Sequence, residues 1–407
     1  VESQSYVALN ENSACMWTRG TLTKTWVGFV FFYTKKAPHK ITSIGVDRGI
    51  TPPPDKRLTP APDEKNLKKR TRDYLHALKG TPFFSGNVLI ARNGKILLHQ
   101  GTGWADAEKK QHIRRDTRFY IASVSKIFVA TAILQLYDRG LLQPGDPLSK
   151  FIPAYPRHIA DQVTVHHLLT HTSGIELDEI PEFNAAEPHN IQEMVELQIR
   201  YIPQVKELSE YTLPGEYNYT NEGYALLARI VEVCSGMDYW TYVKRHIFEP
   251  CGMKNTVPVH LNQQPGNTAV GYSNRRPADG AYPTAGQTAI HIAQNSFAHP
   301  AGGVFSTTGD LWAFSERLFS GKLLSARSFE LMTQSQVPVF ENSSYGYGLR
   351  IDKSTAGTVW GHGGDKVGFN SRLDYYPESG YTVIVLCNKD QVAKNLADFV
   401  QELLYRS

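Results

Sequence analysis

The sequence predicts an α/β protein in which one antiparallel sheet is built from both ends of the compact part of the chain. A helix and a hairpin open this part at residues 63–100, and strands with a final helix close it at residues 347–405. Helical segments fill the middle. Because such chain ends can pair in one sheet, we expect terminal helices to flank it and the helical segment to form an inserted lobe. A cleft between lobes is where a site is expected.

The opening elements carry clear local signals. Asp63 is a helix N-cap, with Leu67, Tyr74, Leu75 and Leu78 on one face and Gly80 at the end. The strand-like segments 87–92 and 95–100 then flank Asn93-Gly94, the pair that type I′ turns prefer. These residues predict a helix followed by a tight hairpin.

The closing elements are predicted from their apolar patterns. We expect strands over residues 347–351, 369–376 and 381–386, and an amphipathic helix over residues 392–405. A long helix is expected after Ser123.

The first 62 residues differ from the rest. The segment 26–33 is β-rich but has no partner that the pattern reveals, and five prolines between residues 52 and 62 predict a stiff linker. We therefore expect a separable extension at 1–62 and a domain at 63–407. Its α/β part is expected at about 63–120 and 310–407, and its helical part at about 121–309.

Composition excludes several classes of protein. The 407 residues are 41% hydrophobic and 20% charged, which is ordinary for a globular chain. No apolar run is long enough to span a bilayer, and no basic stripe interleaves with aromatic residues. The four cysteines form no C-x-x-C pair. We expect no transmembrane segment, no nucleic-acid partner and no zinc ribbon.

Three short motifs carry groups that could do chemistry. The first is Ser123-Val-Ser-Lys126, which opens an apolar helical run and places a hydroxyl and an amine one turn apart. An adjacent base activates a serine nucleophile, and a helix N-terminus favours developing negative charge. The alternative is a serine N-cap followed by a surface lysine.

The second motif is Tyr219-Thr-Asn221. In an extended segment, residues two apart face the same way, so Tyr219 and Asn221 can enter one cleft. A lysine cation beside Tyr219 would favour its phenolate and make it a proton relay. The alternative is a packing tyrosine and an Asn221 that only caps the next helix.

The third motif is the run from Gly361 to Asp365, Gly-His-Gly-Gly-Asp, just before a predicted strand. Glycines beside a strand let a substrate approach the backbone closely. His362 could bind a carboxylate or orient the site. The alternative is a tight turn with an exposed histidine.

Together the motifs resemble those of the penicillin-recognising serine hydrolases, the superfamily of class C β-lactamases, D,D-peptidases, D-aminopeptidases and β-lactamase-like esterases. The signature there is S-x-x-K, then Y-x-N in the class C branch, then K-T-G or a variant. Other segments are similar too, among them VTVHHLLTHTSGI (163–175) and AGGVFSTTGDLW (301–312). The resemblance covers about residues 64–407 and implies a β-lactamase-like fold.

The resemblance also implies roles at the site. Ser123 would be the acylated nucleophile, and Lys126 and Tyr219 would share the proton transfers. Asn221 would position substrate and Lys126. The backbone N–H groups of Ser123 and Asp365 would form the oxyanion hole. His362, Gly363 and Gly364 would bind substrate.

One departure bears on the substrate. Relatives with β-lactamase or D,D-peptidase activity usually have lysine at the position of His362, and a histidine is mostly neutral at pH 7. We therefore expect an ester or amide substrate, as in a carboxylesterase or a D-amino-acid or D,D-peptidase, with weak or no β-lactamase activity.

Alternatives remain open. The chain could be a true class C-type β-lactamase, or a penicillin-binding sensor that does not turn over. We expect no cofactor and no metal, since His167 and His171 lack an HExxH frame and a third ligand. The resemblance suggests a periplasmic or secreted protein, although no signal peptide is visible.

Overall fold

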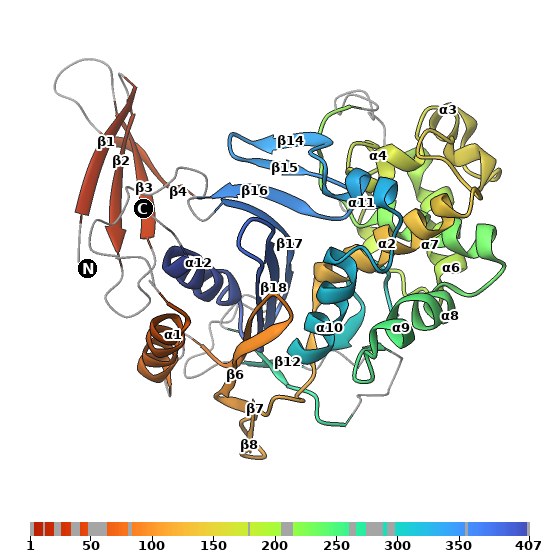
Figure 1. Ribbon diagram of the computed structural model, residues 1–407. Coiled ribbons are helices and arrows are strands. Elements are labelled where there is room, and N and C mark those ends of the chain that lie inside the picture. Colours follow the sequence, from red (N-terminus) through yellow and green to blue (C-terminus); the bar gives the residue numbers. More distant parts are fainter. Residues whose placement is uncertain are drawn as a thin grey trace. The chain divides into compact units, whose positions relative to one another are not determined.

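The structure of the chain is a computed structural model with two compact units, residues 1–84 with 395–407 and residues 85–394 (Figure 1). For the first four described segments, which lie between residues 4 and 47, the structure describes the backbone but not the side chains. The described segments are residues 4–10, 13–19, 26–33, 41–47, 63–79, 84–177, 180–204, 215–259, 266–273, 288–290, 298–354 and 357–404.

The first unit contains an antiparallel sheet in the order β1-β2-β3-β4. The β-rich segment Trp26–Tyr33 is β3, and it pairs with strands on both sides, so it has partners that the pattern did not reveal. The predicted proline linker lies outside the described residues, and a domain boundary at residue 62 stays a prediction. The other strands are β1 (Gln4–Asn10), β2 (Ser13–Arg19) and β4 (Ile41–Asp47).

Two helices of this unit match the expected terminal helices. In α1 (Glu64–Leu78), the carboxylate of Asp63 accepts from the backbone N–H of Asn66 at 2.7 Å, as predicted for an N-cap. Its expected apolar face is buried. The ring of Tyr74 stacks on Phe399 of α12 (Ala393–Leu404) with centroids 4.1 Å apart. Gly80, the expected helix end, lies outside the described residues.

The second unit is built on an antiparallel sheet of eight described strands, in the order β14-β15-β16-β17-β18-β19-β5-β6. The hairpin near the start of the unit lies beside the last strand of the chain, so the prediction of one sheet from both ends is confirmed. The strands are β5 (Gly86–Arg92), β6 (Lys95–Thr102), β14 (Val337–Phe340), β15 (Ser343–Tyr345), β16 (Arg350–Ser354), β17 (Gly357–Lys366), β18 (Phe369–Tyr376) and β19 (Tyr381–Cys387).

Local sequence explains the centre of this sheet. The strand β19 reads Tyr-Thr-Val-Ile-Val-Leu-Cys and is buried along its whole length. Four of these residues are β-branched, a type that is enriched in strands. Asn93 and Gly94 have φ angles of 48° and 78°, which are the positive values that a type I′ turn needs. The predicted hairpin is confirmed.

Two expectations about strands were wrong. The strand expected over residues 347–351 begins only at Arg350, and the third motif lies within the ten-residue strand β17 rather than before a strand. Glycine is depleted in strands, and this strand contains four glycines, so its pattern does not stand out. At Gly361 a Cβ would collide with the carbonyl oxygen of Leu373 on the paired strand, and only glycine fits.

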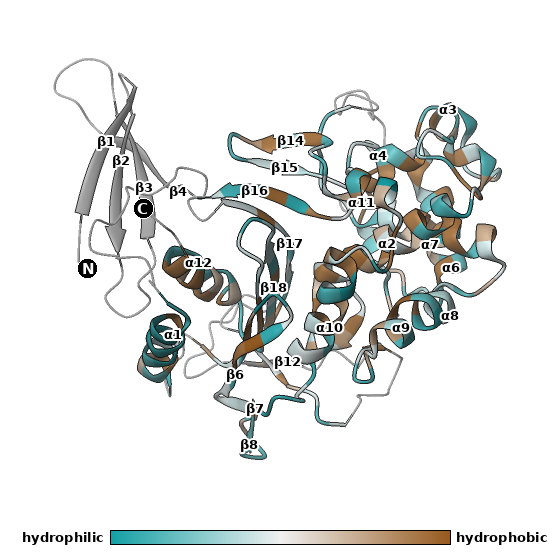
Figure 2. Ribbon diagram, in the orientation of Figure 1, coloured by the Kyte–Doolittle hydropathy of each residue, from teal (hydrophilic) through white to brown (hydrophobic). Residues whose placement is uncertain are grey.

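Helices fill the middle of the chain, as expected. Figure 2 shows hydrophobic colour on helices of this part, and most residues of α2 are buried. Besides α2 (Lys126–Asp138), the α-helices are α3 (Arg157–Ala160), α4 (Val165–Leu169), α5 (Pro181–Asn184), α6 (Ile191–Tyr201), α7 (Glu222–Ser235), α8 (Tyr239–Val243), α9 (Glu249–Cys251), α10 (Thr308–Phe319) and α11 (Ala326–Thr333). The 3-10 turns are η1 (Ala122–Ser125), η2 (Leu148–Lys150) and η3 (Ile202–Gln204), and η4 (Lys244–Phe248) is a π-turn.

Packing of helices on the sheet positions the motifs. The helix α10 lies against β19 and β5, while η1, which carries Ser123, lies against β17 and β18. The helix α7, which follows the second motif, packs on α2. All three motifs therefore meet where η1 contacts the sheet.

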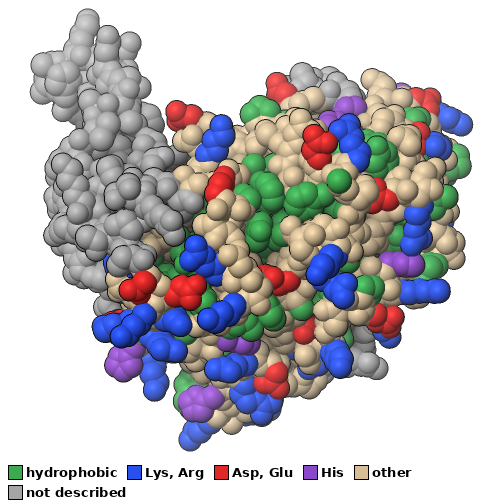
Figure 3. Space-filling model, viewed as in Figure 1, with side chains coloured by type: hydrophobic (Ala, Val, Ile, Leu, Met, Phe, Trp, Pro, Cys, Tyr) green, Lys and Arg blue, Asp and Glu red, His purple; other side chains and the backbone are tan. Residues whose placement is uncertain are grey.

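Small sheets complete the unit. One joins β10 (Val257–Pro258), β13 (Val304–Ser306) and β9 (Phe119–Tyr120), and two strand pairs are β7 (Trp104–Asp106) with β8 (Gln111–His112) and β11 (Gly271–Ser273) with β12 (Thr288–Ile290). None of the described helices has the length and apolar character needed to cross a membrane. Basic and acidic side chains are intermixed over the face shown in Figure 3.

Candidate active site

Ser123 lies in η1, which runs directly into α2. The preceding Ala122 has a φ of 45°, a left-handed conformation that costs energy and is concentrated at functional sites. Ser125 is completely buried, and its Oγ donates to the carbonyl of Ala122 at 2.8 Å. Ser123 lines a pocket. Of the two serines in the motif, Ser123 is therefore the one that a substrate can reach.

Lys126 lies one turn later and is completely buried. Its Nζ contacts the Oγ of Ser123 at 3.0 Å, the Oδ1 of Asn221 at 2.8 Å and the carbonyl oxygen of Ala301 at 3.2 Å. The alternative of a surface lysine is wrong. The amine is instead held between the first and second motifs.

Burial lowers the pKa of Lys126 to about 7, because desolvation penalises the cation, and the carboxylate of Glu222 opposes this shift. A neutral amine has two N–H donors and one lone pair. Asn221 and Ala301 supply two acceptors for the N–H groups, which leaves the lone pair for the O–H of Ser123. The site can therefore hold a neutral lysine with every hydrogen bond satisfied.

Asn221 occupies the N-cap position of α7, but its side chain makes no capping hydrogen bond. Its Oδ1 accepts from Lys126 instead. The alternative in which Asn221 only caps the helix is wrong.

Tyr219 faces the same lysine. The Nζ of Lys126 lies 4.6 Å from the centroid of the Tyr219 ring, and 38% of Tyr219 is exposed where it lines the pocket. Desolvation of the hydroxyl raises the pKa of Tyr219 above its ordinary value, although a hydrogen bond to Ser123 acts the other way. The expectation of a favoured phenolate was wrong, because desolvation of the hydroxyl raises the pKa by more than Ser123 and Arg350 lower it. Tyr219 is a protonated phenol at neutral pH.

His171 is a residue of the site that sequence reasoning missed. Its ring lies 4.2 Å from that of Tyr219 and its Nδ1 accepts from the backbone N–H of Thr220 at 3.2 Å. It lies beyond the end of α4 with a φ of 58°, so it is not on a helix with His167. The spacing of these histidines suggested only a metal pair, and nothing in it indicated a support for Tyr219.

The third motif faces Ser123 from β17. A Cβ at Gly364 would collide with the carbonyl oxygen of Ile121 and with the Oγ of Ser371, so glycine is required for β17 to lie against η1. The Oγ of Ser371 donates to that same carbonyl at 2.6 Å, which fixes β18 to the residues before Ser123. His362, Gly363, Gly364 and Asp365 all line the pocket with Ser123.

His362 is only 3% exposed, so the alternative of a turn with an exposed histidine is wrong. Its Nδ1 lies 2.6 Å from the carbonyl oxygen of Gly363, and its Nε2 lies 3.0 Å from the hydroxyl of Tyr345. Burial, and the nearby Lys126, lower the pKa of His362 to about 3. This histidine is therefore neutral at pH 7.

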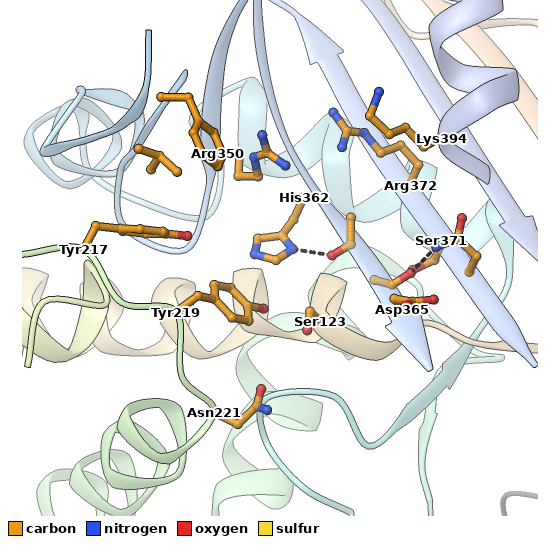
Figure 4. Close-up of a pocket in the computed structure, with 15 residues that line it drawn as sticks. Ser123, Tyr217, Tyr219, Asn221, Arg350, His362, Asp365, Ser371, Arg372 and Lys394 are labelled. Carbon is orange, nitrogen blue, oxygen red and sulfur yellow. Dashed lines mark hydrogen bonds between the residues drawn. The ribbon is translucent and has the colours of Figure 1, made fainter. Parts of the chain in front are cut away.

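The pocket has a volume of about 580 Å³ and joins all three motifs (Figure 4). In this view Tyr217 and Arg350 lie on one side of His362, and Arg372 and Lys394 lie on the other. The lining residues that were not expected from the sequence are Tyr217, Val339, Phe340, Arg350, Asn370, Ser371, Arg372 and Lys394. They come from elements that meet only in the folded chain.

Arginines of the pocket have acidic partners. The Nε of Arg372 donates to both carboxylate oxygens of Asp374, at 2.8 and 2.9 Å. A nitrogen of Arg350 lies 3.4 Å from the Oδ1 of Asp352. These ion pairs reduce the net positive charge that the arginines present to a ligand. Among the described residues, no group of three or more His, Cys, Asp or Glu is placed to hold a metal ion.

Comparison with known proteins identifies the family of the chain. The profile of the family described as Beta-lactamase matches residues 76–405. The chain belongs to the Beta-lactamase family. PbpX of Bacillus subtilis (strain 168), a protein named as a penicillin-binding protein, is 33% identical over 312 residues, which are 76% of this chain and 71% of that protein.

Solved structures of this family share the fold. A penicillin-binding protein from Bacillus halodurans is 26% identical with a TM-score of 0.68, over 81% of this chain and 98% of that one. A D-amino acid amidase from Ochrobactrum anthropi SV3, solved with D-phenylalanine, is 25% identical with a TM-score of 0.69, over 84% and 98%. The chain is a serine hydrolase of the penicillin-recognising superfamily with a β-lactamase-like fold.

Proposed function

We propose that this hydrolase cleaves an ester or an amide through an acyl-enzyme on Ser123. The observation that carries the proposal is the 3.0 Å contact between the Oγ of Ser123 and the Nζ of Lys126, a buried amine whose pKa is about 7. A general base works best when its pKa lies near the working pH.

Acylation follows from this geometry. Neutral Lys126 takes the proton of Ser123 as its Oγ bonds to the substrate carbonyl carbon, and the carbonyl π electrons move to oxygen. The backbone N–H groups of Ser123 and Asp365 stabilise that oxyanion. When the oxyanion collapses, the bond to the leaving group breaks, and the leaving group receives a proton from Lys126 through the hydroxyl of Tyr219.

Deacylation repeats these steps with water. Water gives its proton to the amine of Lys126 as its oxygen attacks the acyl carbon. The bond from that carbon to the Oγ of Ser123 then breaks, Lys126 returns the proton to the Oγ, and the acid product is released. Asn221 holds the amine in place through its Oδ1. Gly363 lets the substrate lie against β17, whereas the missing side chain of Gly364 is required for the contact with η1.

The substrate class follows from the charges. His362 is neutral where relatives with β-lactamase or D,D-peptidase activity usually have a lysine, and acidic partners pair with Arg350 and Arg372. We therefore expect these residues to bind a substrate carboxylate weakly. This supports a carboxylesterase or an amidase of the D-amino-acid type, in line with the D-amino acid amidase in the same family.

A β-lactamase is the second candidate, because Arg350, Arg372 and Lys394 all line the pocket and offer positive charge to a carboxylate. The experiment that separates the two measures turnover of a short-chain ester, a D-phenylalanine amide and a cephalosporin, with Ser123→Ala as the control. The proposal expects Ser123-dependent steady turnover of the ester or the amide and slow turnover of the cephalosporin. A cephalosporin turned over fastest would refute it, and a single stoichiometric burst with every substrate would indicate a sensor.

A further inference from the structure

Three buried side chains join the second motif to the third by a continuous path of hydrogen bonds. The backbone N–H of Thr220, between Tyr219 and Asn221, donates to the Nδ1 of His171 at 3.2 Å. The Nε2 of His171 lies 3.3 Å from the hydroxyl of Tyr345, and that hydroxyl lies 3.0 Å from the Nε2 of His362. The Nδ1 of His362 then contacts the carbonyl of Gly363 at 2.6 Å.

The two ends of this path fix where its protons are. A backbone N–H can only donate, so the Nδ1 of His171 carries no proton and its Nε2 donates to Tyr345. A carbonyl can only accept, so the Nδ1 of His362 carries a proton and its Nε2 accepts from Tyr345. Burial lowers the pKa of both imidazoles, which keeps each in its neutral form. The hydroxyl of Tyr345 therefore accepts from one histidine and donates to the other.

Of these side chains, His171 also packs directly on Tyr219. The ring of His171 lies tilted against that of Tyr219, with centroids 4.2 Å apart, and meets Tyr345 edge-on at 4.9 Å. Tyr345 is completely buried in β15, and His171 is 1% exposed. Neither lines the pocket, so neither is placed to touch the substrate.

We propose that Tyr345 and His171 are positioning residues that fix the position of Tyr219 relative to the glycine-containing strand β17. The inference rests on the proposed function, since its purpose is to keep the proton relay and the oxyanion donor aligned on one substrate carbonyl. Displacement of such groups by about 1 Å can lower the rate by about 10²-fold.

The first test is the pair Tyr345→Phe and Tyr347→Phe. Each removes one buried phenolic hydroxyl. Tyr347, however, contacts the Nδ1 of His166 at 2.8 Å and does not line the pocket, which makes it a matched control. We expect Tyr345→Phe to lower kcat by about 10- to 100-fold with KM within about threefold, and Tyr347→Phe to leave both unchanged. Equal losses in the two variants would overturn the proposal.

The second test uses His171→Asn. Asparagine tolerates the left-handed backbone of residue 171, and its Oδ1 can replace the acceptor that Thr220 needs, but it cannot reach Tyr345. We expect a loss of kcat like that of Tyr345→Phe, and a double variant no slower than the worse single one, because both cut the same path. If the losses of the two single variants multiply in the double variant, the two changes act independently, which would contradict a shared path of hydrogen bonds.

A third readout does not depend on turnover. In protein labelled with ¹⁵N at histidine, NMR of the resting enzyme should show His171 as the Nε2–H tautomer and His362 as the Nδ1–H tautomer, with Tyr345→Phe changing both signals. The opposite tautomer at either histidine would overturn the proposal, even if Tyr345→Phe did not fold. If Ser123→Ala keeps full turnover, the proposed function fails, whereas the tautomers still decide whether the path of hydrogen bonds exists.

Discussion

The Nζ of Lys126 lies 3.0 Å from the Oγ of Ser123, at a point where Lys126 has no solvent exposure. In the proposed mechanism this contact joins the nucleophile to its general base, and burial lowers the pKa of that amine to about 7. The hydroxyl of Tyr219 is protonated there and can pass a proton on but cannot serve as the resting base. The two groups therefore have different roles in the proposed mechanism, because burial lowers the pKa of Lys126 and raises that of Tyr219.

The pH dependence of the reaction should report Lys126. Because its pKa is lowered to about 7, the neutral amine is present above that value and is lost as the pH falls through it. We expect kcat/KM for a neutral ester to rise with pH and level off above about 7. His362 should add no step in this range, since its pKa is about 3. A profile that is flat through neutral pH would contradict Lys126 as the base.

Glu222 should tune that profile. Its carboxylate favours the cationic form of Lys126 and so raises the pKa of the amine. Glu222→Gln removes the charge and keeps the shape, and the acid limb of the profile should move to lower pH. Movement in the other direction, or no movement, would show that Glu222 does not act on the base. Thermal unfolding of the variant serves as the control for folding.

Tyr219→Phe should separate proton transfer from packing. The change keeps the ring that packs on His171 and removes only the hydroxyl, so the melting temperature should stay close to that of the unaltered protein. Turnover should fall by about 10²- to 10⁴-fold, the usual share of a general acid–base group. Turnover close to the unaltered rate would mean that Tyr219 only packs and that Lys126 transfers protons alone.

How far the site could be predicted depended on whether its residues were local in sequence. Ser123 and Lys126 are one turn apart, and Tyr219 and Asn221 are two residues apart, so each pair could be found from its spacing. His171 and Tyr345 could not, because no local pattern shows that the fold brings them together at 3.3 Å.

The fold, too, could be predicted where it depends on local sequence and not where it depends on tertiary packing. The hairpin at Asn93-Gly94 and the apolar strand β19 follow from local preference, and both were predicted. The strand β17 was missed because its glycines are there for close approach to η1 and β18, a tertiary requirement that runs against strand propensity. The ionisation of Tyr219 was mispredicted for a related reason, since desolvation depends on packing and the sequence shows only the neighbouring charge.

His362→Lys should test what sets the substrate class. A lysine would bring a cation to a position where the histidine is neutral, so the rate for a cephalosporin carboxylate relative to that for a neutral ester should rise. Ester turnover should stay level or fall, because lysine also breaks the contact with Tyr345. If the two substrates respond equally, His362 does not set the substrate class.

The central claim is that Ser123 becomes acylated, and mass spectrometry of the protein after reaction with a fluorophosphonate tests it most directly. The account predicts one adduct per chain, on the peptide that contains Ser123, and none in Ser123→Ala that still melts cooperatively. Ser125 is buried and bonded to Ala122, so it should carry no label in either protein. A label on Ser125 or on any other serine, or undiminished labelling of Ser123→Ala, would contradict the account.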